Sequence, residues 1–478
     1  MLNLVGIYRQ SQRGYSEKPP YFPPCIFEEY PFKDNRIDAK NELYSSFRQL
    51  LFLLGLDADN FGKKDWNPFG GFIIPGQTVF IKPNFVRDLD ERGRPKVRGI
   101  IVHGSLVRAV IDYVYIALKG KGRIIVADGP VDDASFEKIE SLTGLYEIKR
   151  FYKDFAGFEI EIYDLRQEKV IKRKGEIIDR IRLKGDPAGY TSVDMGGMSY
   201  FKDDSLDYLS FRGAECKTDV MFQHHNANKN EYLISNTFLD SDVVINIAKM
   251  KTHKRSGVTL TLKNLIGVTG DRNWLPHFNS NNGNQGPIGR GRDIIRIFLK
   301  GIFRRLSGPM KDTLKQFYGV TDEAKKIGNW YGNDIIWRTI LDLVYISRFA
   351  DRRGVIRKDR QRKMFSIIDG IVAGEGDGPL NPIEKPCGIL IAGFNEFYVD
   401  MVTARLMGFD VMKIPKFKNL LKLSRPGFGR IDLEDIRCVS NQEEWDLGRF
   451  ADFSGRCLNF RPHYGWKGYI EVQDNGRK

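Results

Sequence analysis

Three apolar stretches between residues 77 and 127 decide the fold: QTVFI at 77–81, SLVRAVIDYVYIAL at 105–118 and RIIVA at 123–127. The first and third are short runs typical of buried strands, whereas the second has the length and the apolar face of a helix. A strand, a helix and a strand in this order make a βαβ unit, which almost always forms a right-handed crossover in a parallel sheet. These stretches therefore predict an α/β protein.

Strands and helices continue to alternate along the chain. The expected strands are 158–163, 242–248, 364–368 and 388–392, and the expected helices are 134–146, 259–266 and 397–407. We therefore predict a doubly wound α/β fold, with a mostly parallel sheet, a polar β-rich insertion and a helical insertion.

The pattern divides the chain into six parts. They are an N-terminal segment that packs on the core (1–76), a first α/β part with the βαβ unit (77–171), a polar insertion (172–236), a core strand and helix with a Lys-Thr-His motif (237–278), a glycine-rich loop and basic helical insertion (279–363), and a second α/β part with a C-terminal extension (364–478).

Composition narrows the class of protein. No apolar stretch approaches the roughly 20 residues that span a bilayer, and the N-terminal sequence MLNLVGIYRQSQRG lacks the features of a signal peptide. The five cysteines are widely spaced with no CxxC pair, which indicates buried thiols in a reducing compartment. We expect a cytoplasmic protein, and its net charge of +14 permits anionic partners of several kinds.

Each predicted strand is followed by an unusual polar motif. The motifs are Lys82-Pro83-Asn84, Asp128-Gly129-Pro130, the run KMKTHK at 249–254, Asp369-Gly370 continuing to EGDGP at 375–379, and Asn395-Glu396. In an open, mostly parallel sheet, ligands bind beyond the carboxyl ends of the strands, where loops converge and helix N-termini point. The motifs therefore predict a binding site at this edge.

Lysines and histidines supply the chemistry expected there. The predicted anion-binding residues are Lys82, Asn84, Asp128, Lys249, Lys251, Thr252 and Asn264, and the predicted catalytic residues are His253, His103 and Lys263. Several ammonium groups can bind one carboxylate or phosphate, and imidazole exchanges protons near neutral pH. His277 also lies beside a turn of this kind. The alternative is a solvated lysine-rich loop with structural histidines.

Asp369, Glu375 and Asp377 are the predicted ligands of a divalent metal. Carboxylate oxygens on a glycine-rich backbone suit a hard cation such as Mg²⁺. The spacing is not that of an EF-hand calcium loop, and a surface turn is the alternative interpretation.

Five segments resemble the domain-of-unknown-function 362 family of prokaryotic proteins: VFIKPNF at 79–85, IIVHGSLVRAVIDYV at 100–114, VVINIAKMKTHKRSGVTLTLKNLIGV at 243–268, IIDGIVAGEGDGP at 367–379 and YVDMVTARLMGF at 398–409. The resemblance extends from about residue 77 to 430 and implies no particular chemistry. Some relatives carry a ferredoxin-like module, but this chain has no matching cysteine cluster, so no built-in iron-sulfur cluster is expected. The family often has Thr-His-Pro where this chain has Val102-His103-Gly104.

A more distant similarity, to lactate-racemase-type proteins that hold a nickel-containing nucleotide, concerns the fold, from which function does not follow.

The main functional hypothesis is an enzyme that binds a carboxylated or phosphorylated small molecule, with assistance from a divalent metal. A second hypothesis is a nucleic-acid-binding protein, because a basic run at 352–363 lies near Trp330, Tyr331 and Trp337. A third is a scaffold attached to an anionic membrane by a basic amphipathic helix at 292–306, although such a helix more commonly packs on its own core. The sequence specifies neither the reaction nor the oligomeric state.

Overall fold

The structure is a computed structural model that describes residues 2–173, 176–213, 217–280, 322–423, 425–450, 453 and 456–472. The helix expected at 292–306, and most of the glycine-rich loop before it, lie outside the described residues.

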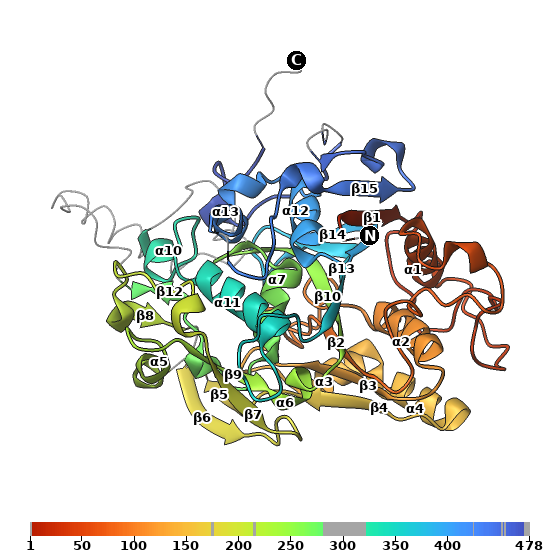
Figure 1. Ribbon diagram of the computed structural model, residues 1–478, viewed down its shortest axis with the longest axis horizontal. Helices are drawn as coiled ribbons and strands as arrows, with labels where there is room; N and C mark the ends of the chain where they lie inside the picture. Colours follow the sequence, from red (N-terminus) through yellow and green to blue (C-terminus); the bar gives the residue numbers. More distant parts are fainter. Residues whose placement is uncertain are drawn as a thin grey trace, which may run out of the picture.

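A large mixed sheet forms the centre of the molecule (Figure 1). Its strands lie in the order β15 (Arg437–Ser440), β1 (Leu4–Arg9), β14 (Ile383–Gly393), β13 (Lys363–Glu375), β10 (Val243–His253), β2 (Thr78–Pro83), β3 (Arg123–Asp128) and β4 (Ile160–Asp164), with β11 (Gly257–Val258) paired to β10. Along this order only β14 runs antiparallel to its neighbours. The sheet confirms the predicted α/β fold.

Helices cover both faces of the sheet (Figure 1). One face packs against α1 (Glu42–Leu53), α2 (Gly104–Leu118), α3 (Phe136–Thr143) and α4 (Leu145–Ala156), and the other against α7 (Leu260–Asn264), α11 (Ile336–Phe349), α12 (Glu396–Leu406) and α13 (Pro415–Lys422). The strands follow the period of two: Val79 and Ile81 face the first helical layer, and Phe80 between them faces the second. Such double burial explains why these strands are almost continuously apolar.

The polar region forms a β-rich insertion, as expected. It consists of β5 (Glu168–Arg173), β6 (Glu176–Arg182), β7 (Tyr190–Asp194), β8 (Phe211–Arg212), α5 (Thr218–His224), β9 (Glu231–Ser235) and α6 (Asn236–Leu239). These strands form three two-stranded sheets, in which β5 pairs with β6, β7 with β9, and β8 with β12 (Phe278–Asn279). A short helix, α10 (Asp322–Lys326), follows later in the chain.

Two central strands, β10 and β13, continue well beyond the carboxyl ends that the sequence pattern predicts. β10 continues past Ala248 to His253, so the lysine-rich motif is not a solvated loop but a buried strand. β13 likewise runs to Glu375, which places Asp369 in the middle of a strand. Apolar patterning ended both predictions early, because it cannot detect polar side chains that are buried with hydrogen-bond partners.

Candidate functional site

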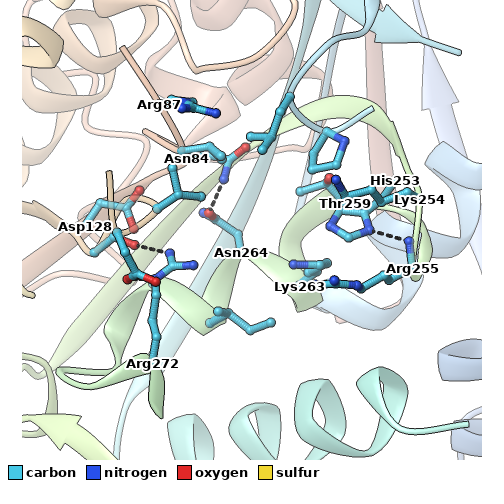
Figure 2. Close-up of a pocket in the computed structure, with 18 of the residues that line it drawn as sticks. Asn84, Arg87, Asp128, His253, Lys254, Arg255, Thr259, Lys263, Asn264 and Arg272 are labelled. Carbon is cyan, nitrogen blue, oxygen red and sulfur yellow. Dashed lines mark hydrogen bonds and ion pairs between the residues drawn. The ribbon is translucent and has the colours of Figure 1, made fainter. Parts of the chain in front are cut away.

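A cavity of about 280 Å³ opens where β2, β3 and β10 end at their carboxyl termini, beside α7 (Figure 2). This is the place where open, mostly parallel sheets bind ligands. Seven cationic side chains line it against four acidic ones: Arg87, Lys172, Lys251, Lys254, Arg255, Lys263 and Arg272 against Glu91, Asp128, Asp132 and Asp133. With all of them ionised, the cavity carries an excess of positive charge.

A buried ion pair forms the floor of the cavity. Lys82 Nζ lies 2.5 Å from Asp128 Oδ1, and the backbone amide of Phe85 donates to Asp128 Oδ2 at 2.7 Å. Lys82 does not line the cavity, and its ammonium group is already engaged by Asp128 and by the carbonyl oxygen of Pro83. The structure therefore places it as a structural partner of Asp128 rather than as an anion-binding residue.

Asn264 connects this floor to β10. Its Nδ2 donates to the carbonyl oxygen of Lys82 at 3.1 Å and to Asn246 Oδ1 at 2.8 Å. Its Oδ1 accepts from Asn84 Nδ2 at 2.9 Å (Figure 2). Three strands and α7 are thereby joined by one hydrogen-bonded network, which holds the cavity in a fixed shape.

Gly267 permits the close approach of this network to the segment after α7. A Cβ atom at this position would lie 2.0 Å from Asp128 Oδ1 and 2.7 Å from Lys82 Nζ. The carbonyl oxygen of Gly267 also accepts from the amide of Gly129 at 2.8 Å. A side chain at residue 267 is therefore incompatible with the ion pair.

Lys251 lies deep in the cavity wall on β10. Its Nζ donates to the carbonyl oxygen of Ile100, and no carboxylate pairs with it within the described ranges. Burial lowers the pKa of Lys251 well below its usual value, and the nearby Lys249 and Lys263 lower it further. The charged form of Lys251 is thus held at a free-energy cost.

Lys263 faces the same space from α7 (Figure 2). In the part of the chain that the structure describes, its ammonium group has neither a hydrogen-bond partner nor an ion-pair partner. Burial is the main cause that lowers the pKa of Lys263 to about 7, followed by the positive charges of Arg272, Lys416 and Arg255. The protonation of Lys263 therefore changes near neutral pH.

Asp400 fixes the short helix that carries Lys263. Its Oδ1 accepts from the amide of Thr261 at 2.7 Å, and its Oδ2 accepts from the amide of Leu262 at 3.0 Å. Leu260, just before them, has φ +52°, a left-handed conformation that non-glycine residues rarely adopt. Strained backbone of this kind persists where surrounding contacts enforce it, and it is common at functional sites.

Two histidines on the cavity wall have complementary hydrogen bonding. His253 Nδ1 accepts from the amides of Arg255 at 3.0 Å and Ser256 at 3.2 Å, so the proton of the neutral ring is on Nε2. His277 Nδ1 lies 2.8 Å from the carbonyl oxygen of Leu275, to which it donates, so its Nε2 carries the lone pair. Burial lowers the pKa of both rings well below 6.5, which keeps them neutral.

Two buried polar atoms at the cavity have no partner in the described structure. Asn84 Oδ1 and Thr259 Oγ1 both lack a hydrogen bond, and their residues are only 5% and 3% exposed. Both residues line the cavity. An unsatisfied buried polar group costs about 1–3 kcal/mol, so these atoms point to a missing partner.

Four of the cations that line the cavity are paired with carboxylates. The ion pairs are Arg87 with Asp133 at 2.6 Å, Lys172 with Asp133 at 3.2 Å, Arg272 with Asp132 at 3.4 Å and Lys254 with Glu91 at 3.6 Å. Lys251 and Lys263, by contrast, have no carboxylate partner in the described structure.

A second polar cluster contains residues that the sequence assigned to the same site. Lys249 Nζ lies 3.0 Å from Asp369 Oδ2 and 2.6 Å from the hydroxyl of Tyr15, which donates to Asp369 Oδ1. The His103 ring stacks on Tyr15, and its Nδ1 accepts from the amide of Ser105 to cap α2. None of these residues lines the cavity. The prediction that Lys249, His103 and Asp369 belong to the same site as Lys251 is therefore wrong.

Burial determines the protonation state of His103. Burial and the neighbouring Lys249 lower the pKa of its ring to about 3, so it is a neutral helix cap. The position of His103 directly before a helix in the sequence is thus explained by helix capping and not by catalysis.

The three carboxylates expected to hold a metal lie in separate settings. Asp369 pairs with Lys249, Glu375 pairs with Arg461 at 2.6 Å and with Lys385 at 3.0 Å, and Asp377 lies 3.0 Å from His463 Nε2. No group of three metal-ligating side chains occurs among the residues that the structure describes. The prediction that these three carboxylates bind one metal ion together is therefore wrong. Thr252, also assigned to the ligand, donates instead to the carbonyl oxygen of Gly376 at 3.0 Å.

The aromatic residues near the basic run are occupied within the protein. Trp337 is 3% exposed, with its Nε1 donating to Asp334 Oδ1 at 2.8 Å, and Tyr331 stacks on Tyr469. Base stacking in single-stranded nucleic acid complexes needs exposed rings. The contacts of Trp337 and Tyr331 therefore weaken one of the observations behind the nucleic-acid hypothesis, which also rests on the basic run and on the net positive charge.

Six of the predicted residues thus line the cavity: Asn84, Asp128, Lys251, His253, Lys263 and Asn264. The prediction missed Thr259 and Arg272 and did not select His277, although the turn beside His277 was a usable signal. Tyr15 had no such signal, since only the fold brings it to Asp369.

Comparison with known proteins shows the family to which the chain belongs. The model of the family described as "Domain of unknown function (DUF362)" matches residues 79–193 and 193–405, more than half of the chain, so the protein belongs to this family. A curated relative, the thylakoid-associated protein sll1697 of Synechocystis sp., is 24% identical over 210 residues. That match covers 44% of this chain and 44% of the relative. No helix among the described residues is long and apolar enough to cross a membrane.

The Gly267 contact gives a test of the floor. We predict that Gly267→Ala lowers the free energy of unfolding by about 3 kcal/mol, because the new methyl group forces Lys82 and Asp128 apart and leaves buried charges unpaired. Urea denaturation measures the change. The matched control is Gly197→Ala, where a Cβ atom meets nothing within 4 Å. Equal effects of the two substitutions would contradict the assigned role of Gly267.

Proposed function

We propose that the cavity binds a small molecule through a carboxylate or phosphate group. The observation that carries this proposal is a pair of lysines that line the cavity, the fully buried Lys251 and the partly buried Lys263, which have no carboxylate partner in the described structure. An anion between them would supply charge-assisted hydrogen bonds and offset the cost of burying their charges. Lys251 would hold the anion, and Lys263 would approach it from α7.

The two unpartnered polar atoms of the cavity favour a ligand that carries further polar groups besides its anionic group. Asn84 Oδ1 can only accept a hydrogen bond, whereas Thr259 Oγ1 can donate or accept. A hydroxyl group on the ligand satisfies an acceptor of this kind. The proposed class is therefore a hydroxylated carboxylate or phosphate ester.

We further propose that the site is enzymatic and exchanges a proton with this ligand. A general acid or base works best with a pKa near the working pH, and Lys263, at about 7, meets this condition. His253 offers an N–H that can donate a hydrogen bond and His277 a lone pair that can accept one, so ligand groups of either kind have a neutral partner on the wall. The geometry supports proton transfer at a position next to the anionic group.

Anion binding is tested with inorganic sulfate, which stays fully ionised near neutral pH. We predict that Lys251→Met and Lys263→Gln each raise the Kd for sulfate at least tenfold, because hydrogen bonds to charged groups contribute about 1.5–3 kcal/mol. Isothermal titration calorimetry measures the Kd. Lys138→Gln, on the exposed face of α3, is the matched control and should bind as the wild type does.

A melting temperature within a few degrees of the wild type shows that the variants fold. Unchanged sulfate affinity in both folded variants would overturn the anion site.

The lowered pKa of Lys263 predicts how binding depends on pH. A bound anion raises this pKa above its value of about 7, so binding takes up a proton at pH values above 7. Affinity for sulfate should be nearly constant below pH 6 and fall, by up to tenfold per pH unit, as pH rises above 7. Lys263→Gln should flatten this dependence. The same slope in the wild type and the variant would assign the titration to another group.

Deuterium exchange tests proton transfer itself. We predict that the protein, in D₂O, introduces deuterium beside the anionic group of at least one member of a panel of 2-hydroxycarboxylates and sugar phosphates. Lys263→Gln should slow this exchange about 100-fold or more, the usual contribution of a general acid or base. Proton NMR follows the exchange. A substrate exchanged equally fast by the variant would exclude Lys263 as the proton-transfer group.

A further inference from the structure

A second hollowed surface lies at the opposite end of the sheet, where β2, β10 and β13 begin. It consists of three adjoining hollows of about 520, 440 and 250 Å³. The first two share Leu2, Phe72 and Phe394, and the last two share Asp242, Gln361 and Arg362. We call this continuous surface the amino-end groove.

One end of the groove is strongly basic. Its cations are Arg352, Arg353, Arg357, Arg360, Arg362 and Lys363, all from the basic run of the sequence. Arg352 lies 3.6 Å from Asp240, and Arg357 lies 2.5 Å from Asp351. The other four have no carboxylate partner in the part of the chain that the structure describes. The groove therefore has a local excess of positive charge.

Arg362 makes this end a built site rather than a solvated patch. The residue is only 4% exposed, and its guanidinium donates to the carbonyl oxygens of Ser347 at 3.1 Å and of Leu239. Its Nε has no hydrogen-bond partner in the described structure. Burial lowers the pKa of Arg362 to about 10, although the nearby Asp240 raises it. Arg362 lines two of the hollows, so its guanidinium places a positive charge without a carboxylate partner in the described structure at the wall of the groove.

The other end of the groove is apolar. The largest hollow is lined by Leu2, Leu56, Pro68, Phe72 and Phe394, with Asp57, Asn67 and two glycines. Leu2 is 56% exposed, and so is Ile74, two residues after Phe72 in the chain. Lys363 joins the two ends, since its Nζ donates to the carbonyl oxygen of Phe72 at 3.0 Å. Apolar and cationic surfaces are therefore continuous.

We infer that the amino-end groove binds an anionic phospholipid at the surface of a bilayer. The lipid phosphate would meet Arg353 and Arg362, and the neighbouring acyl chain would lie against Phe72 and Phe394. Charge complementarity selects the anionic headgroup, and the adjoining apolar hollow selects an amphiphile over a free phosphate. This inference is independent of the strand-end cavity, which opens at the opposite end of the sheet.

Vesicle flotation with the full-length protein tests this inference. We predict flotation with vesicles that contain phosphatidylglycerol and none with pure phosphatidylcholine vesicles. The double variant Arg353→Gln/Arg360→Gln should bind roughly 25-fold more weakly, at about fivefold for each cation near an anionic surface. Leu2→Gln should also weaken binding, because it places a polar group at the apolar end.

Matched controls keep the result specific. Lys138→Gln/Lys153→Gln removes two exposed cations from α3 and α4, and Leu209→Gln removes a leucine that is 67% exposed. Both controls, and Lys263→Gln in the strand-end cavity, should float like the wild type.

Three outcomes would overturn the inference. One is flotation that survives Arg353→Gln/Arg360→Gln but is lost in Phe298→Glu, which would assign membrane binding to residues 292–306. Another is binding of soluble glycerol phosphate that is as tight as binding to vesicles and unaffected by Leu2→Gln, which would show a free anion site. The third is binding of RNA, but not of vesicles, that depends on Arg353 and Arg360.

Discussion

The buried ion pair between Lys82 and Asp128 is the interaction on which the candidate site depends. It joins the carboxyl ends of β2 and β3, and Asn264 connects the same point to β10 and α7. Breaking a buried pair of this kind costs about 3–5 kcal/mol, because it leaves one charge unpaired in the interior. This arrangement requires a glycine at position 267, because a side chain there would collide with Asp128 and Lys82.

The polar groups of the cavity wall, unlike the Lys82–Asp128 pair, lack some of their hydrogen-bond or ion-pair partners among the described residues. In the described structure Lys251 and Lys263 have no carboxylate partner, and the buried atoms Asn84 Oδ1 and Thr259 Oγ1 have no hydrogen-bond partner. Folded proteins seldom leave buried polar groups unpaired, and functional sites are where they do. The contrast between floor and wall separates structural lysines from those that we propose to meet a ligand.

Sequence reasoning found the fold because the strands are buried on both faces and therefore read as apolar runs. It found six cavity residues because polar motifs at strand ends converge in a mostly parallel sheet. It failed for Lys249, His103 and Asp369, since the bulge in β10 between Lys249 and Lys251 and the contact with Tyr15 are tertiary features. The carboxylates were wrongly assigned to a metal because no sequence pattern marks their cationic partners, such as Arg461 and Lys385.

Selenate diffraction tests the central claim most directly. Selenate has the charge and shape of sulfate, and its selenium atom gives an anomalous signal that locates it in a crystal of the full chain. Our account predicts an anomalous peak in the strand-end cavity, with selenate oxygens within hydrogen-bond distance of Lys251 Nζ and Lys263 Nζ. A well-diffracting crystal soaked in selenate with no peak in this cavity would contradict the account.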